Sequence, residues 1–117
     1  GPTGRVLAFL QSAARGEKDA LREALDFDAL YAGAGGLPAD ATRRRLFEQV
    51  LLERLGDPDW LEERGLLFVA GACDAKSLVE ELDKHQATVR PKGAPKRTAF
   101  RLAKSGGKWR IVGLPSG

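Results

Sequence analysis

Asp26, Asp28 and Tyr31 form the only short cluster in this sequence that combines acids with a hydrogen-bonding aromatic side chain. A carboxylate that is removed from water can act as a general base, and a phenol beside it can polarise a substrate. The same pattern is typical of capping or solvent-facing acids on either side of a buried Phe27. We prefer this structural interpretation and keep the catalytic one as an alternative.

Eight basic residues near the C-terminus form the sharpest charge feature. All 16 acidic residues lie at or before Asp83, so the chain carries −6 before Lys84 and +9 from there onward. We expect the basic residues on three neighbouring strands and their turns, where they could bind nucleic acid, an anionic membrane surface or an acidic protein surface. The interpretation that we prefer is that they serve solubility or face the acids of the helices or of a second protomer. The predicted binding residues are Arg90, Lys92, Lys96, Arg97, Arg101, Lys104, Lys108 and Arg110.

Nucleic acid is the least favoured of these partners. Binding of single strands depends on exposed aromatic rings on which bases stack. Phe100 and Trp109 are predicted to face inward, and Arg101 and Arg110 to be cross-strand neighbours on the opposite face, with Lys104 on or near that face. We therefore expect a protein partner or a small ligand, with an anionic membrane surface as the electrostatic alternative.

The remaining candidates for chemistry favour structural interpretations. His85, the one histidine, falls in a predicted turn, and Cys73, the one cysteine, allows neither an intrachain disulfide nor a cysteine-based metal site. Residues 33–36 follow no strand and lack the Lys-Ser/Thr sequel of a phosphate loop. We expect no metal and no cofactor. Residues 43–45 are three arginines at a predicted helix start, where their positive charge interacts unfavourably with the helix dipole. A bound anion or acidic partner would relieve this conflict, but we prefer the interpretation that the three side chains are solvated.

Apolar spacing of three and four residues predicts helices in the first half of the chain. Thr3 and Gly16 are the predicted cap and end of the first, and Asp40 or Thr42 caps the longest, with an apolar stripe that includes Leu46. Phe27 and Leu30 are predicted to insert into the core before a Gly-rich loop from Ala32 to Pro38. The predicted helices are Arg5–Ala14, Glu17–Leu25, Asp40–Leu55 and a turn at Pro58–Arg64.

Alternating apolar and polar residues predict strands in the second half. Two alternating runs joined by Gly106-Gly107 indicate a β-hairpin, and Asp83–Gln86 is a predicted turn. Helices followed by strands indicate an α+β fold, with N-terminal helices packed on a curved antiparallel sheet that is a C-terminal meander. The predicted strands are Leu66–Ala72, Ser77–Leu82, Ala87–Arg90 and the two arms of the hairpin Arg97–Val112.

The length of 117 residues predicts one domain, residues 1–117. The opening Gly-Pro resembles a protease scar, so we expect one module of a larger protein. High usage of Arg, Ala, Gly and Leu without Met suggests a bacterial source. No run approaches the roughly 18 apolar residues of a membrane span. We therefore expect a soluble domain of the bacterial cytoplasm or cell envelope.

Two stretches resemble the nuclear-transport-factor-2-like superfamily. Residues 6–21 resemble its opening helix, Gly-acid break and second helix, and residues 100–112 resemble its last two strands, whereas residues 29–73 depart from its pattern. The resemblance implies a cone in which a curved sheet wraps round helices. Members include isomerases, dehydratases and polyketide cyclases, and also non-catalytic ligand-binding, dimerising and accessory domains.

We therefore expect a non-catalytic accessory domain of a bacterial protein. It would bind a protein or a small ligand through its exposed sheet or cone mouth, and a homodimer through the sheet is among the forms that the resemblance implies. The first alternative is a small isomerase- or cyclase-type enzyme with Asp26 or Asp28 as base and Tyr31 as polariser. The second is an electrostatic binder that uses the basic strands.

Overall fold

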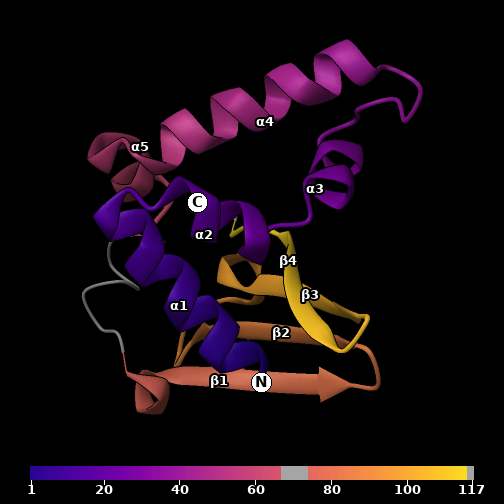
Figure 1. The fold of residues 1–117 in the computed structure, drawn as a ribbon. Coiled ribbons are helices and arrows are strands. Elements are labelled where there is room, and N and C mark those ends of the chain that lie inside the picture. The colour runs from indigo at the N-terminus through magenta and orange to yellow at the C-terminus, as the bar shows by residue number, and fades with distance from the viewer. Residues whose placement is uncertain (67–73, 116–117) are drawn as a thin grey trace.

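Helices precede a sheet in the computed structural model of this protein, which describes residues 1–66 and 74–115 (Figure 1). Within these residues the five α-helices are α1 (Pro2–Arg15), α2 (Lys18–Ala24), α3 (Phe27–Gly33), α4 (Ala41–Leu55) and α5 (Pro58–Glu63). One-turn 3-10 helices, η1 (Ala75–Ser77) and η2 (Lys96–Thr98), flank the first two strands. The four strands are β1 (Leu78–Asp83), β2 (Gln86–Pro91), β3 (Phe100–Ser105) and β4 (Lys108–Gly113). The predicted α+β order is confirmed.

Short acids start three of the helices. The side chains of Asp26, Asp40 and Asp57 each accept a hydrogen bond of 3.0 Å from a backbone N–H two or three residues later. Each bond satisfies one of the amide groups that a helix start leaves without a partner. At the other end of α1, Gly16 takes a left-handed conformation, with φ of 69°, and ends the helix as predicted.

The first helix begins earlier than the sequence indicated. Gly1 is its N-cap residue and Pro2 is already helical and buried, so the predicted cap at Thr3 is wrong. Instead, the backbone N–H and the hydroxyl of Thr3 both donate to Glu80 Oε1, at 3.0 and 2.8 Å. The Glu80 carboxylate, which comes from strand β1, thus accepts a hydrogen bond from a backbone N–H in the first turn of α1. This contact holds the start of α1 over β1.

The sheet is an antiparallel meander in the order β1-β2-β3-β4. Two of the strand pairs are joined by two-residue turns. Lys84-His85 joins β1 to β2, and Gly106-Gly107 joins β3 to β4. Gly106 and Gly107 both have positive φ, 59° and 79°, which a tight hairpin turn of this kind requires and glycine adopts freely. The predicted hairpin and the predicted turn before β2 are confirmed.

The inner face of the sheet, defined here as the face that packs on the helices, carries the core. Helix α1 lies across this face, and α2 and α3 contact β4 (Figure 1). The ring of Phe9 meets that of Phe100 edge-on, with centroids 5.8 Å apart. Because side chains alternate along a strand, the intervening residues form the opposite, outer face. The buried inner-face residues are Leu78, Ala87, Val89, Phe100, Leu102 and Ile111.

The pairing of β3 with β4 corrects two predictions. The two-residue turn sets the register in which Arg110 lies opposite Ala103, so Arg101 and Arg110 are not direct neighbours. A bulge at Val112 then shifts the next pair, so Arg101 lies opposite Gly113. Lys104 was expected on or near the outer face, but it pairs with Trp109 on the inner face, where both lie at the partly exposed end of the hairpin.

Helix α4 runs across the end of the molecule opposite β1 and contacts chiefly α3 and α5 (Figure 1). Only its C-terminal part is therefore buried, at Leu51, Leu52 and Leu55. Leu46 was predicted in the apolar stripe but is 58% exposed, whereas Leu52 was missed and is 4% exposed. Trp60 and Leu61 of α5 pack against the core as predicted.

The β4 edge of the sheet pairs with the segment between α2 and α3. At the β4 edge, Leu25 pairs in parallel with Ile111, and the N–H of Asp26 donates to the carbonyl of Ile111 at 2.9 Å. Phe27 and Leu30 follow directly and are buried as predicted, although α3 continues to Gly33, where a loop was expected.

Residues 67–72 of the predicted strand Leu66–Ala72 lie outside the described residues. No helix in the described ranges is both long and apolar enough to cross a membrane.

Two glycines near α3 should respond oppositely to alanine. A Cβ added at Gly36 would collide with the ring of Tyr31, which is held against Phe47 with centroids 5.4 Å apart. We expect G36A to lower the free energy of unfolding by about 1 to 2 kcal/mol through overpacking. A Cβ at Gly33 meets nothing within 4 Å, so G33A should raise it by up to about 1 kcal/mol. Urea denaturation of both variants checks the pair, and equal effects would contradict the packing around Tyr31.

Candidate functional site

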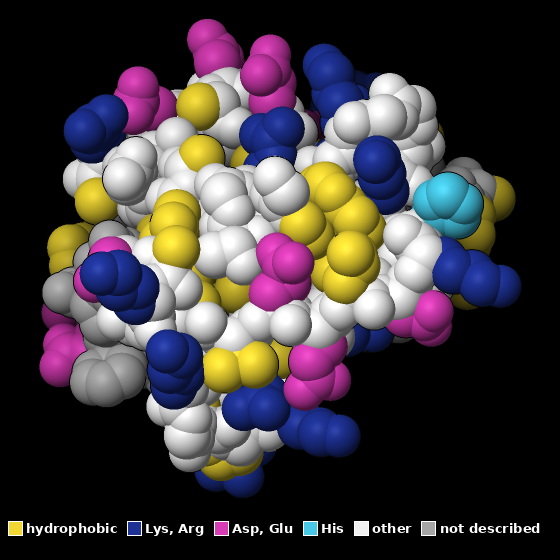
Figure 2. Space-filling view, turned by 90° about the horizontal axis from the view of Figure 1, so that it is seen from below, with side chains coloured by type: hydrophobic (Ala, Val, Ile, Leu, Met, Phe, Trp, Pro, Cys, Tyr) yellow, Lys and Arg dark blue, Asp and Glu magenta, His cyan; other side chains and the backbone are white. Residues whose placement is uncertain are grey.

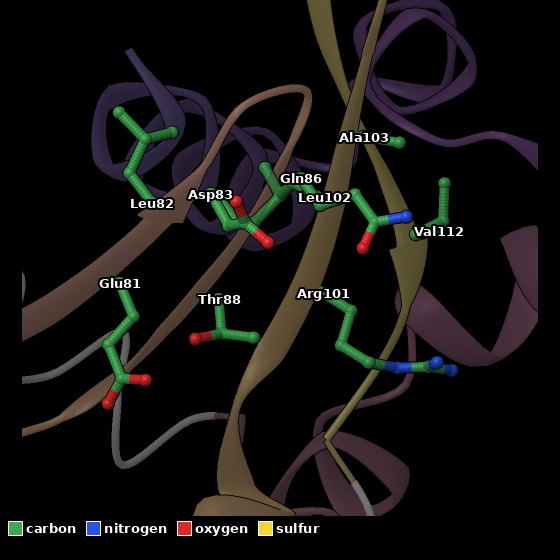
Figure 3. Close-up of a pocket in the computed structure, with 10 residues that line it drawn as sticks. Glu81, Leu82, Asp83, Gln86, Thr88, Arg101, Leu102, Ala103 and Val112 are labelled. Carbon is green, nitrogen blue, oxygen red and sulfur yellow. The ribbon is translucent and has the colours of Figure 1, made fainter.

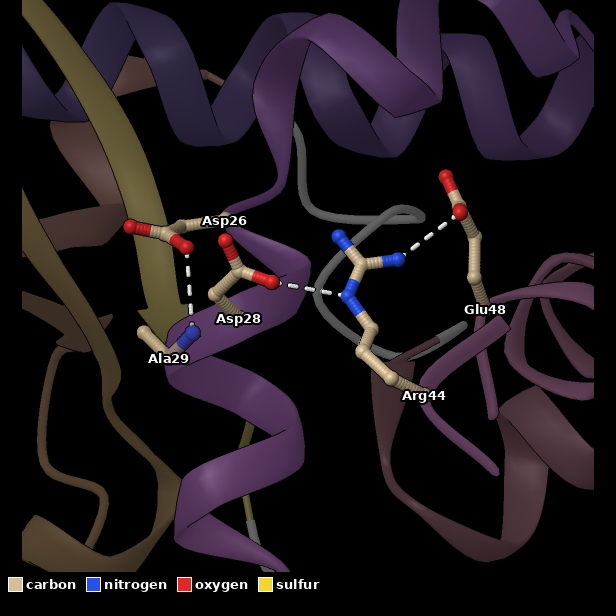
Figure 4. A network of polar contacts seen from close by, with 5 residues as sticks. All are labelled: Asp26, Asp28, Ala29, Arg44 and Glu48. Carbon is tan, nitrogen blue, oxygen red and sulfur yellow. Dashed lines mark hydrogen bonds and ion pairs between the residues drawn. The ribbon is translucent and has the colours of Figure 1, made fainter. Parts of the chain in front are cut away.

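The predicted acid cluster separates on folding (Figure 4). The carboxylate of Asp26 is used as the cap of α3, through its bond to the N–H of Ala29. Asp28 points the other way, toward Arg44, with Nε and Oδ1 2.8 Å apart. Asp28 and Tyr31 line a common hollow of about 310 Å³, and Asp26 does not.

This hollow does not give Asp28 the environment of a general base. The Asp28 side chain is 85% exposed and is ion-paired with Arg44, whereas the proposed general base would have to be removed from water. Tyr31 packs on Phe47 beside Gly36. The contacts of all three residues are those of helix capping and of packing between α3 and α4, which favours the structural interpretation of the cluster.

Arg44 joins α3 to α4 and is the best-anchored charged side chain of this region. Its Nε bonds to Asp28 and its Nη1 to Glu48 Oε2 at 2.9 Å, while its guanidinium lies 5.6 Å from the ring centroid of Phe27. The hydrogen bond to Asp28 is the largest cause that raises the pKa of Arg44, against the opposing effect of burial. The expectation of solvated arginines at 43–45 is thus wrong for Arg44, because α3 brings an acid to it.

The predicted basic residues do not gather on one face. Arg90, which is partly buried, donates to Glu81 Oε1 at 3.3 Å and to the carbonyl of Ala94 at 3.1 Å. Lys104 lies on the inner face, with its Nζ 5.9 Å from the ring centroid of Trp109. The connection from β2 to β3 carries Lys92, Lys96 and Arg97. By register and alternation, the outer face carries Arg90, Arg101, Lys108 and Arg110.

Strand pairing arranges the outer face in charged rows. One row runs from Glu81 through Thr88 to Arg101, and the next runs from Asp83 through Gln86 and Ala103 to Arg110. In these two rows the face is therefore acidic at β1, neutral at β2 and neutral or basic at β3 and β4, and Arg90 adds a positive charge further along β2 that is paired with Glu81. Since neighbouring strands lie about 4.8 Å apart, the backbones at Glu81 and Arg101 are separated by roughly 10 Å.

A hollow of about 370 Å³ lies on this face, and we call it the outer-face hollow (Figure 3). Glu81 and Arg101 lie on opposite sides of Thr88 in the view of Figure 3. Small or neutral side chains lie between the two charges. The residues that line the hollow are Glu81, Leu82, Asp83, Gln86, Ala87, Thr88, Arg101, Leu102, Ala103 and Val112.

Arg101 is the one predicted binding residue that lines this hollow. Its guanidinium lies over Gly113, where an added Cβ would come within 2.5 to 2.8 Å of it, and it forms no ion pair with any described residue. The absence of a side chain at Gly113 thus gives Arg101 its place. The acids of the hollow, Glu81 and Asp83, were missed. Their alternation in β1 was visible in the sequence, but their position opposite Arg101 depends on the pairing of three strands.

The surface around the edge strand has mixed charge (Figure 2). In this view from below, Lys and Arg side chains alternate with Asp and Glu, and hydrophobic side chains reach the surface between them. His85 is exposed in the turn before β2, as predicted. Leu82 is 60% exposed at the same end of β1. Folding therefore brings the acidic and basic parts of the chain together on the sheet.

Comparison with known proteins adds no family. No protein-family model, curated protein or solved structure matches this chain. The resemblance to the nuclear-transport-factor-2-like superfamily therefore stays a prediction.

Among residues 1–66 and 74–115, no three His, Cys, Asp or Glu side chains are grouped so that they could hold a metal ion.

Arg44 and Arg45 provide a matched test of the α3–α4 bridge. R44Q should lower the free energy of unfolding by about 1 kcal/mol, because it breaks two ion pairs to a side chain that is only 27% exposed. R45Q, at an exposed neighbour without an ion pair among the described residues, should change it by less than about 0.5 kcal/mol. Urea unfolding followed by circular dichroism measures both, and equal losses would show that the bridge does not stabilise the fold.

Proposed function

We propose that this protein is a non-catalytic binding domain, a module of a larger bacterial protein, whose ligand or protein partner occupies the outer-face hollow. The observation that supports this most directly is the charge pattern of the hollow. Acids of β1 and Arg101 of β3 lie on opposite sides of neutral side chains, while the inner face is filled by the core. A surface of this kind can recognise a partner and leaves the fold undisturbed.

The chemistry of the hollow favours a partner that carries both signs of charge. A cationic group would lie beside Glu81 and Asp83, and a carboxylate would accept paired hydrogen bonds from Arg101. Thr88 and Gln86 offer further donors and acceptors between the two ends. A peptide segment with one basic and one acidic side chain meets all of these requirements.

Recognition is a better account of these acids than proton transfer. Glu81 and Asp83 are both exposed, and Glu81 is ion-paired with Arg90 at 3.3 Å. Exposed acids on a strand are placed to attract a cationic group of a partner. The mixed charge of the face likewise favours a partner of mixed charge over nucleic acid or a purely anionic membrane.

A second copy of the chain is one partner of the proposed kind. A two-fold rotation would set the acidic strand of one outer face against Arg101 and Arg110 of the other, so the pattern is self-complementary. The homodimer through the sheet is therefore part of the same proposal, because it would use the same surface.

The proposal is tested with acetylated hexapeptides that carry one Lys and one Glu two to four residues apart. Chemical-shift changes in amide spectra should be confined to β1, β2, β3 and the bulge at Val112, and peptides of a single charge sign should bind at least about fivefold more weakly. R101Q or D83N should weaken binding about five- to tenfold, since each removes a charge-assisted contact. K92Q, outside the hollow, should have no effect.

A dilution series without peptide distinguishes the second copy from other partners. Shifts of the same outer-face amides with protein concentration, together with sedimentation as a dimer, would identify a second copy as the occupant. If neither peptides nor concentration shifts any outer-face amide, the proposed function is wrong.

A further inference from the structure

A second cavity, of about 350 Å³, lies where α3, α4 and α5 approach the end of β4. Its walls combine apolar side chains with three arginines. Leu30 and Leu51 are buried, and Phe47, Trp60 and Leu114 are partly buried against the core. Such a volume, with apolar walls and a few polar groups, is typical of sites for small molecules.

The polar side chains of this cavity are three arginines. Arg54 comes from α4, Arg64 follows α5 directly and Arg101 comes from β3. No acid lines the cavity among the described residues, and none of the three arginines is ion-paired with a described acid. Arg64 is held by its ring contact with Trp60, at 5.1 Å from guanidinium to centroid.

Three arginines that line one cavity make its surroundings positive and so favour an anion there. Arginine keeps its charge at any physiological pH, and its planar fork pairs with carboxylate and phosphate oxygens. The apolar walls require that the rest of such a ligand be apolar, since burial of its hydrocarbon surface supplies the remaining free energy.

We propose that this cavity binds an amphipathic anion, a hydrocarbon chain or ring that carries a carboxylate or phosphate group. The apolar part lies against Phe47, Leu51 and Trp60, and the oxyanion lies among the arginines. The site goes beyond the proposed function, because it takes a different ligand and shares only Arg101 and Val112 with the outer-face hollow.

Trp60 provides a direct readout of this site. It is one of two tryptophans, and the other, Trp109, does not line the cavity. In a W109F background, decanoate below its micelle-forming concentration should change the Trp60 emission saturably, because the chain replaces water beside the indole. Decanol, which has the same chain without the charge, should bind at least about tenfold more weakly.

Two variants separate charge from shape. R54Q/R64Q should weaken decanoate binding about tenfold or more and leave decanol unchanged. A34F adds a ring at an exposed residue that lines the cavity, and it should weaken both ligands without a change in charge. The matched control R45Q/K108Q removes two exposed charges outside the cavity and should bind as the parent does.

The source of the anion is distinguished with vesicles of phosphatidylglycerol and of phosphatidylcholine. Binding to the former that depends on Arg54 and Arg64, without binding of decanoate, would identify a lipid headgroup as the source. Equal binding of decanoate and decanol, or parent-like binding by R54Q/R64Q to every probe, overturns the inference. E81Q/D83N should not alter decanoate binding, so failure here is distinguishable from failure of the proposed function.

Discussion

Burial of one face of the sheet against α1 is the constraint on which the rest of the structure depends. Val89, Phe100, Leu102 and Ile111 must all point toward Phe9 and its neighbours, and all of them are buried. A slip of one residue in any strand would turn these side chains into water and bring charges into the core. The core therefore sets the strand register, and the register in turn decides which charges meet on the outer face.

The bulge in β4 shows how a local irregularity shapes the surface without disturbing the core. Leu102 still faces Ile111, but Arg101 meets Gly113, because Val112 is the extra residue. The guanidinium of Arg101 then occupies the space that a side chain at 113 would fill. As a result Arg101 lies between the outer-face hollow and the cavity beside α4, where it can contact a ligand in either.

Local features of the fold could be predicted from the sequence, and long-range ones could not. The cap at Asp40, the end of α1 at Gly16 and the Gly-Gly hairpin depend on residues adjacent in the chain, and all are confirmed. The exposure of Leu46 depends on where α4 leaves the body of the molecule. The opposition of Glu81 and Arg101 depends on two strand pairings, and the arginine cavity joins residues from Leu30 to Leu114, so no sequence spacing indicated either site.

The uneven charge of the chain acquires a physical meaning in the folded protein. Several acids of the first part of the chain form hydrogen bonds or ion pairs within the fold. Four of them accept a hydrogen bond at a helix start, and Asp28 pairs with Arg44. The four capping acids are Asp26, Asp40, Asp57 and Asp74. None of these acids forms an ion pair with Arg54, Arg64 or Arg101. The arginines around that end therefore keep their charge uncompensated within the described residues. The same distribution of acids that stabilises the helices thus leaves a positive, apolar cavity available to an anion.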